Sequence, residues 1–213
     1  MDARLRVADV ADVGTDTVAL TFDSPAAFDA DPGQFVRLEA TVDDETYRRF
    51  YTVSSPDTDE SFEVTVEAAE AGGPFSAHLA ALDAGDELGM AGPFGDASYD
   101  GDGRAVVLAG GPGVGPAVAI GEAALSAGEP AAVVYRDDDP VHRERLDALR
   151  DAGVAVTVLD GEASLTAAVD EAVTGAADET AFVYGFEAFV ADAEAAVEAA
   201  DASPATVHVE SFG

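Results

Sequence analysis

Residues 4 to about 95 alternate apolar side chains with polar or small ones over short runs. At residues 5–10 and 17–22 this alternation predicts half-buried strands of an antiparallel sheet. Further runs of the same kind occupy residues 34–40, 48–54, 62–67 and 87–91. Residues 75–82 instead place apolar side chains at helical spacing. Six short strands with turn residues between them predict a small antiparallel barrel that carries one short helix.

The pattern changes after residues 96–103, a polar segment punctuated by glycine. Short apolar runs that fit buried strands follow at residues 105–109, 131–135, 154–159, 181–184 and 206–209. Helical patterns separate them at residues 116–127, 140–151, 162–174 and 187–200. Alternating strands and helices predict a five-stranded, parallel, doubly wound sheet. We therefore expect two domains, residues 1–96 and residues 103–213.

A glycine-rich turn follows the first strand of the second domain. Its glycines are Gly110, Gly111, Gly113 and Gly115. Pro116 suits the first position of the next helix, and Gly128 suits the C-terminal cap of that helix. A strand, a glycine loop and a helix start together point backbone N–H groups at a phosphate. The dinucleotide fingerprint G-x-G-x-x-G would need glycine at position 116, so this stretch alone leaves a turn without a ligand equally open.

The segment R-F-Y-T at residues 49–52 carries side chains that can bind a flat, phosphorylated ligand. On a strand, Arg49 and Tyr51 share one face, and Phe50 and Thr52 share the other. An arginine can hold a phosphate, a tyrosine ring can lie against a heterocycle, and a hydroxyl can bond a ring nitrogen. An ordinary aromatic strand with an exposed arginine is the alternative.

A second glycine pair stands at Gly72 and Gly73, in the segment G-G-P-F-S that ends at Ser76. Two glycines before a helix start that carries a hydroxyl form another possible anion cradle. A simple connection from a hairpin to a helix explains the same residues.

Taken in order, these segments resemble the ferredoxin–NADP reductase superfamily. The motifs are R-F-Y-T (49–52), G-G-P-F-S (72–76), G-D-E-L-G-M-A-G-P-F-G (85–95) and A-G-G-P-G-V-G-P (109–116). Each motif is weak alone, but the ordered set is specific and extends over nearly the whole chain. The resemblance implies an antiparallel barrel that binds flavin and a second domain that binds a pyridine nucleotide.

The resemblance also assigns roles to residues of the first domain. Arg49 would hold a flavin phosphate, Tyr51 would pack on the isoalloxazine ring, and Thr52 would lie near flavin N5. Gly73 and Ser76 would receive a pyrophosphate, which favours FAD over FMN. The full set implied to bind the flavin is Arg49, Tyr51, Thr52, Val53, Gly72, Gly73 and Ser76.

In the second domain, the resemblance implies a nucleotide site at the ends of the strands and a C-terminus near the flavin. The residues implied to bind there are Gly110, Gly111, Gly113, Pro116, Arg136, Tyr184, Gly185 and Phe212. Glu210, in the family's E-x-aromatic ending, joins Tyr51 and Thr52 as an expected catalytic residue. The family often has Cys-Gly-Pro where this chain has Tyr184-Gly185-Phe186. Tyr184 excludes a role for a thiol, whereas Gly185 still lets the backbone approach a nicotinamide.

The choice of coenzyme depends on the residues after the second strand of this domain. Arg136 could meet the 2′-phosphate of NADPH, but three aspartates follow it at positions 137–139 and would repel that phosphate. Arg143 and Arg145 are rival partners for a phosphate. The balance favours NADH and leaves NADPH open.

The charge of the chain is extreme, with 43 acidic residues against 10 basic ones and a formal net charge of −33. All the basic residues are arginines. A negative field of this size disfavours nucleic acid and anionic membranes as partners. Self-repulsion falls when salt shortens the Debye length to ~3 Å at 1 M, so we expect a halophilic protein that works in a salt-rich cytoplasm.

Cysteine is absent, which excludes disulfides, thiolate nucleophiles and a cysteine-ligated iron–sulfur cluster within this chain. His78, His142 and His208 lack the spacing of metal ligands and are expected to be structural or surface residues, so no metal site is predicted. The start of the chain has no apolar signal-like segment, and no apolar run reaches ~18 residues. A cytoplasmic protein without membrane insertion is therefore expected.

The expected function is FAD-dependent oxidoreduction, with a hydride passing from NAD(P)H to flavin and electrons passing on to a separate acceptor. Ferredoxin, flavodoxin, a quinone or a larger complex are all candidate acceptors. Two alternatives stay open: a flavin- or nucleotide-binding module without turnover, and an electron-transfer subunit active only within a complex.

Overall fold

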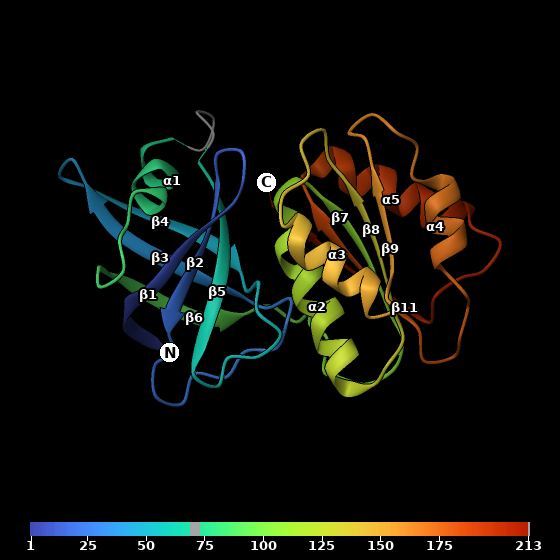
Figure 1. Ribbon diagram of the computed structural model, residues 1–213, viewed down its shortest axis with the longest axis horizontal. Helices are drawn as coiled ribbons and strands as arrows, with labels where there is room; N and C mark the ends of the chain where they lie inside the picture. Colours follow the sequence, from blue (N-terminus) through green and yellow to red (C-terminus); the bar gives the residue numbers. More distant parts are fainter. Residues whose placement is uncertain (69–72, 213) are drawn as a thin grey trace.

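The computed structural model describes residues 1–68 and 73–212, which form two sheets side by side (Figure 1). The N-terminal sheet is antiparallel and has six strands. Its elements are β1 (Asp2–Gly14), β2 (Thr17–Asp23), β3 (Phe35–Val42), β4 (Glu45–Thr52), β5 (Ser61–Glu67), α1 (Gly73–Ala80) and β6 (Glu87–Phe94). The C-terminal sheet is parallel and has five strands. Its elements are β7 (Ala105–Gly110), the 3-10 helix η2 (Gly111–Gly113), α2 (Val114–Ala127), β8 (Ala131–Arg136), α3 (Arg143–Asp151), β9 (Ala155–Leu159), α4 (Thr166–Ala172), β10 (Thr180–Gly185), α5 (Glu187–Ala199) and β11 (Thr206–Ser211).

The antiparallel strands follow the order β4-β3-β6-β1-β2-β5. The two end strands approach each other through the Val53–Val64 bridge, which closes the sheet into a barrel. Alternate residues point inward: Val36 and Leu38 of β3 are fully buried, whereas Arg37 between them is only partly buried. This alternation is the pattern expected of half-buried strands. The predicted six-stranded barrel is confirmed.

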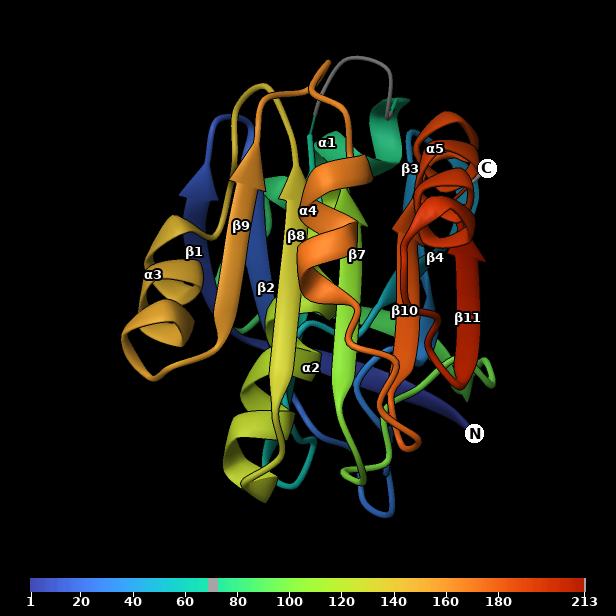
Figure 2. The same cartoon turned by 90° about the vertical axis from the view of Figure 1, so that its right-hand side faces the viewer.

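The parallel strands follow the order β11-β10-β7-β8-β9. Helices α2 and α3 pack on one face of this sheet, and α4 and α5 pack on the other (Figure 2). All six residues of β7 are buried, as a central strand covered on both faces requires. The chain leaves β7 in one direction toward β8 and later returns on the other side as β10, and the carboxyl ends of strands at such a switch form a ligand crevice. The predicted five-stranded doubly wound sheet is confirmed.

Helix α2 begins earlier than the sequence predicts. It begins at Val114, so Pro116 is its third residue, and the prediction that Pro116 takes the first position is wrong. The proline is tolerated because the first four N–H groups of a helix have no partner within the helix. Gly128 ends the helix in the left-handed conformation, with φ of 80°, as predicted.

Two further helices are shorter than their patterns predict. Helix α3 begins at Arg143 and not at residue 140, because His142 takes the left-handed conformation with φ of 53°. Helix α4 ends at Ala172 because Val173 is extended. The division into residues 1–96 and 103–213 stays a prediction, although residues 95–104 lie between the two sheets. None of the described helices combines the length and the apolar composition that crossing a bilayer requires.

Candidate functional site

Strand β4 presents Arg49 between two tyrosines. Tyr47 stacks on Phe75 of α1 with ring centroids 6.0 Å apart, and Tyr51 lies 6.4 Å from the same ring. Arg49 shares their face of the strand, is exposed, and donates to the carbonyl oxygen of Arg48 at 2.9 Å. Burial raises the pKa of the Tyr51 phenol to about 12, and Arg49 opposes this shift. The face combines an aromatic surface with a guanidinium that no described carboxylate holds.

The start of α1 borders this face. A Cβ on Gly73, whose φ is +72°, would meet no atom within 4 Å, so the space above this residue is open. Ser76 is buried and donates its hydroxyl to the carbonyl oxygen of Gly73 at 3.1 Å. Gly72, also predicted to bind flavin, lies outside the described residues.

The opposite face of β4 carries Phe50 and Thr52. Phe50 is 62% exposed and makes edge contacts with Phe35 and Phe94. Val53 is fully buried, and its N–H donates to the carbonyl oxygen of Gln34 at 2.8 Å. Val53 therefore fixes the end of the strand, and its N–H already has a partner.

The glycine loop packs tightly against β10 and α5 and is open at one residue. A Cβ on Gly113 would overlap the carbonyl oxygen of Tyr184, and one on Gly110 would overlap the ring of Phe189. At Gly111, with φ of +55°, the nearest atoms to a Cβ would belong to Phe186 at 3.9 Å and Asp137 at 4.0 Å. The loop is thus fixed by packing and offers its open backbone at Gly111.

A cavity of about 210 Å³ lies between the barrel and the parallel sheet. It reaches Gly111 and Pro112, and Thr52 is not part of its lining. Its lining residues are Thr15, Asp16, Thr17, Glu67, Gly111, Pro112, Asp137, Asp139 and Val141. Both halves contribute carboxylates, so this space favours neutral or hydroxyl-rich groups over anions.

The arginines near this cavity are engaged by other groups. Arg136 donates to Asp192 at 2.9 Å and lies over the ring of Phe189, 5.1 Å from its centroid. Arg145 is held by carboxylates at the junction of the two halves. Arg143 is 3.8 Å from Asp139 and is mostly exposed. A 2′-phosphate would have to displace a carboxylate from any of the three.

The C-terminal strand brings the remaining predicted residues to the carboxyl edge of β10. Phe212 donates its N–H to the carbonyl oxygen of Gly185 at 3.0 Å and meets the half-exposed Phe186 edge to face. Partial burial raises the pKa of the Glu210 carboxyl. Glu210 of β11 lies opposite Tyr184 of β10 in the register of the two strands. Tyr184 is 1% exposed and donates its hydroxyl to the carbonyl oxygen of Ala97 at 2.8 Å. The phenol of Tyr184 therefore points to the segment between the sheets.

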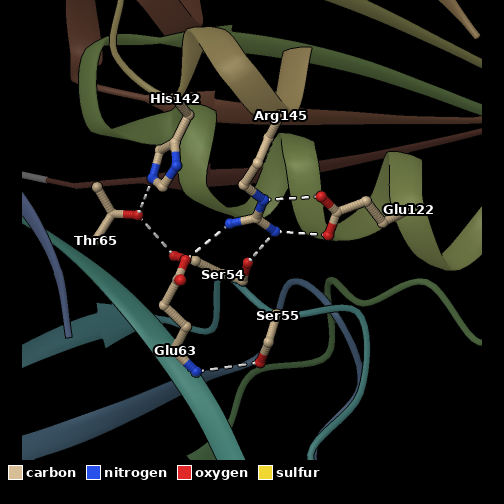
Figure 3. Close-up of polar contacts among 7 residues, drawn as sticks. All are labelled: Ser54, Ser55, Glu63, Thr65, Glu122, His142 and Arg145. Atoms are coloured by element: carbon tan, nitrogen blue, oxygen red, sulfur yellow. Dashed lines mark hydrogen bonds and ion pairs between the residues drawn. The ribbon is translucent and has the colours of Figure 1, made fainter. Parts of the chain in front are cut away.

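The structure also shows a polar cluster at the junction that the sequence analysis missed (Figure 3). Its members are Ser54, Ser55, Glu63, Thr65, Glu122, His142 and Arg145. His142 was expected to be structural, and Arg145 was considered only as a phosphate ligand. No spacing in the sequence could have grouped them, because the bonded pairs are as far as 91 residues apart.

Comparison with known proteins finds a match for the N-terminal half. Residues 4–99 match the family described as the oxidoreductase FAD-binding domain. The glycine betaine monooxygenase reductase subunit of Chromohalobacter salexigens is 37% identical over 108 residues, which cover 49% of this chain and 29% of that protein. A probable electron transfer subunit of dihydroorotate dehydrogenase B (NAD(+)) from Methanopyrus kandleri is 39% identical over 92 residues, covering 43% of this chain and 32% of that protein. The chain spans less than a third of the length of these curated relatives.

Solved structures match the fold over the whole chain. The flavohem-like FAD/NAD binding domain of nitric oxide dioxygenase from Vibrio cholerae has a TM-score of 0.84 at 20% identity, over 99% of this chain and 98% of that one. This chain therefore shares the fold of that structure, with its antiparallel six-stranded sheet followed by a parallel five-stranded sheet.

Proposed function

We propose that this chain is a reductase that binds FAD in its barrel, takes a hydride from a nicotinamide coenzyme at its parallel sheet, and passes electrons to a separate acceptor. The junction of two motifs carries this proposal. The segment that follows Thr52 abuts the first turn of α2, where a Cβ on Gly115 would collide with the hydroxyls of Ser54 and Thr65. The R-F-Y-T strand and the glycine loop are thus held on adjoining parts of the two halves, and transfer between two cofactors depends on such positioning.

The barrel residues fit FAD. Arg49 can hold a phosphate oxygen, and the open space at Gly73 can receive a diphosphate beside Ser76, which favours FAD over FMN. Tyr51 and Thr52 would line the ring of the flavin. Bound FAD would supply the redox chemistry that no side chain here provides, accepting a hydride and releasing electrons. We assign this site to a domain of residues 1–96.

The parallel-sheet residues fit a dinucleotide, and we assign its domain to residues 103–213. Gly111 leaves its backbone open just before the start of α2, so a dinucleotide can approach the loop there. Pro116 lies in the first turn of this helix. Gly185 is buried at the end of β10, and a Cβ there would meet the ring of Phe189 at 2.7 Å, so packing requires the glycine. Glu210 lies at the same edge of the sheet, where partial burial raises the pKa of its carboxyl.

NADH is the coenzyme that the charges favour. Asp137 accepts hydrogen bonds from the hydroxyl of Tyr135 at 3.1 Å and the N–H of Asp139 at 2.8 Å, which fix its carboxylate beside Gly111. A carboxylate in this place can bind ribose hydroxyls and repels a 2′-phosphate. Arg136 is already paired with Asp192.

The acceptor is proposed to be a small redox protein or a partner oxygenase, quinone or larger complex. Two observations favour a separate partner: cysteine is absent from this chain, and two relatives carry the descriptions reductase subunit and electron transfer subunit. An electron-transfer subunit that works only in a complex is the second candidate, and co-purification with a partner would identify it.

Adaptation to a salt-rich cytoplasm is a further part of the proposal. A formal net charge of −33 on 213 residues produces a repulsion that molar salt screens. The melting temperature should rise steeply between about 0.1 M and about 2 M KCl. A melting temperature that stayed flat or fell would contradict this adaptation.

The central test is flavin reduction in molar KCl without air. The protein is expected to bind FAD and to lose its flavin absorbance on addition of NADH, more rapidly than with NADPH. A colourless protein that also fails to take up added FAD would exclude the proposed function. Bound flavin that neither coenzyme reduces would instead identify a binding module without turnover.

A further inference from the structure

The side chain of Arg145 joins three segments at the junction of the two halves (Figure 3). Its Nε donates to Glu122 Oε1 at 2.8 Å, and its Nη2 donates to Glu122 Oε2 at 2.7 Å. Its Nη1 donates to Glu63 Oε1 at 2.8 Å, and Nη2 also reaches the carbonyl oxygen of Ser54 at 2.7 Å. We call Ser54, Glu63, Glu122 and Arg145 the interdomain clasp, because two of its members belong to the barrel and two to the parallel-sheet half.

A second line of contacts lies beside the clasp. The Nε2 of His142 and the Oγ1 of Thr65 are 2.8 Å apart, and the same Oγ1 is 2.9 Å from the hydroxyl of Ser54. The backbone N–H of His142 donates to the carbonyl oxygen of Val13 at 2.9 Å, across the junction. Two neighbouring lines of contact fix an angle between the halves, which one contact alone would leave open.

The segments that the clasp joins are those that carry the two motifs. Ser54 lies two residues after Thr52 on the chain of the R-F-Y-T strand. Glu122 lies on α2, the helix that follows the glycine loop. One guanidinium thus bonds to the end of the flavin strand and to the helix behind the coenzyme loop.

We propose that Arg145 is a positioning residue, which sets the separation and angle between the R-F-Y-T strand and the glycine loop for hydride transfer. This inference rests on the proposed function. Among the residues that the structure describes, the polar partners of Arg145 are Ser54, Glu63 and Glu122, so it acts on the two motifs through Ser54 and Glu122.

The charges explain why an arginine is needed here. The clasp side chains are 24%, 21% and 26% exposed for Arg145, Glu63 and Glu122, so water screens them less than surface pairs. Burial raises the pKa of the Glu63 carboxyl, and the nearby Arg145 opposes that rise. Without the guanidinium, Glu63 and Glu122 would face each other as like charges across the junction and would push the halves apart.

The test compares Arg145→Gln with Arg150→Gln in the full chain, loaded with FAD in molar KCl. Arg150 is a matched control, because it lies on the same helix and its ion pair with Asp147 is within that helix. We expect Arg145→Gln to keep FAD and its affinity for ADP-ribose but to reduce the flavin about tenfold more slowly or worse at saturating NADH. Arg150→Gln should match the wild type.

Hydrogen exchange gives a readout that does not depend on turnover. The amide of His142 bonds across the junction, so its exchange should quicken in Arg145→Gln and stay slow in Arg150→Gln. Two milder variants extend the test if Arg145→Gln fails to fold. Glu63→Gln should shift both measurements in the same direction by less, and Arg145→Lys should recover part of the lost rate.

The outcomes separate the two proposals. If neither coenzyme reduces the flavin of the wild-type protein, the proposed function is wrong. The exchange data would then test only whether the interdomain clasp holds the two halves together. Wild-type rates and wild-type exchange at His142 in Arg145→Gln, or in Glu63→Gln should the first not fold, would overturn the positioning role.

Discussion

The two halves of this protein form their candidate sites from different parts of the chain. In the parallel-sheet half the site is backbone: Gly110 and Gly113 have no room for a Cβ, and Gly111 leaves its peptide open. In the barrel the site is side chain: Arg49 and Tyr51 project from β4, the end strand of the sheet order. The first site is therefore sensitive to volume and the second to chemical group. Substitutions that change only one of these properties can distinguish the two halves.

The largest expected effect comes from added volume in the glycine loop. Gly113→Ala places a methyl group on the carbonyl of Tyr184, a backbone atom that cannot move without shifting β10. We expect a loss of about 3 kcal/mol in the free energy of unfolding, as for overpacked cores, together with loss of NADH-driven reduction. Calorimetry and the reduction assay measure the two.

Gly121→Ala is the control for Gly113→Ala. It lies in the same part of the chain, on α2, and its Cβ would meet the flexible end of Leu149 at 3.0 Å and the Cγ2 of Val133 at 3.7 Å. Its stability should stay within about 1 kcal/mol of the wild type, since alanine also favours the helix. If the two variants behave alike, the loop is not fixed by packing.

A change of group without a change of fold is expected at Arg49. Arg49→Gln removes the charge for a phosphate but disturbs only the contact with the Arg48 carbonyl. Loss of a charged hydrogen bond worth about 2 kcal/mol should lower the affinity for FAD about 30-fold. The melting temperature of the apoprotein should stay unchanged. Titration with FAD tests this, and Arg48→Gln, which removes a neighbouring arginine paired with Glu39, serves as control.

At the junction of the two halves, His142 should make the stability of the protein depend on pH. Burial, with the adjacent Arg145, lowers the pKa of the His142 imidazole from 6.5 to about 3. Between these two pKa values the imidazole is protonated in the unfolded chain and neutral in the folded chain. The free energy of unfolding therefore falls as the pH drops from 6.5 toward 3. Between pH 6.5 and 5 this loss is about 2 kcal/mol.

His142→Asn tests that loss, since asparagine accepts the left-handed backbone at this position. Its free energy of unfolding should fall about 2 kcal/mol less than that of the wild type over this pH range. Chemical denaturation at fixed salt gives the comparison. Parallel pH profiles would mean that His142 is not the group responsible.

The smallest effect is expected at the coenzyme selector. Asp137→Asn removes one charge beside Gly111 while keeping a hydrogen-bonding side chain. Loss of about 1 kcal/mol of repulsion between this carboxylate and a 2′-phosphate would raise the ratio of kcat/KM for NADPH to kcat/KM for NADH about fivefold. Asp139 lines the same cavity, and the double variant should shift the ratio further. An unchanged ratio would place the 2′-position elsewhere.

The amino-acid sequence determined the two sheets, the glycine loop and the R-F-Y-T strand, because alternation, helical spacing and glycine placement are properties of neighbouring residues. Its errors were local. The sequence pattern placed Pro116 at the first position of the helix. None of the N–H groups in the first helical turn has a partner within the helix, so a proline fits elsewhere in that turn as well. Arg136 was considered for a phosphate from its position at the end of β8, but its side chain turns to Asp192 on α5.

The partners of Arg145 could be decided only by the tertiary structure. Glu63 and Glu122 lie 82 and 23 residues away along the chain, and nothing in their local sequences distinguishes them from the other carboxylates of this acidic protein. They meet because the barrel and the parallel sheet dock where the segment after β4 crosses the first turn of α2. Local pattern fixes which way a strand or helix buries its side chains, whereas the approach of two folded halves fixes which charges are neutralised between them.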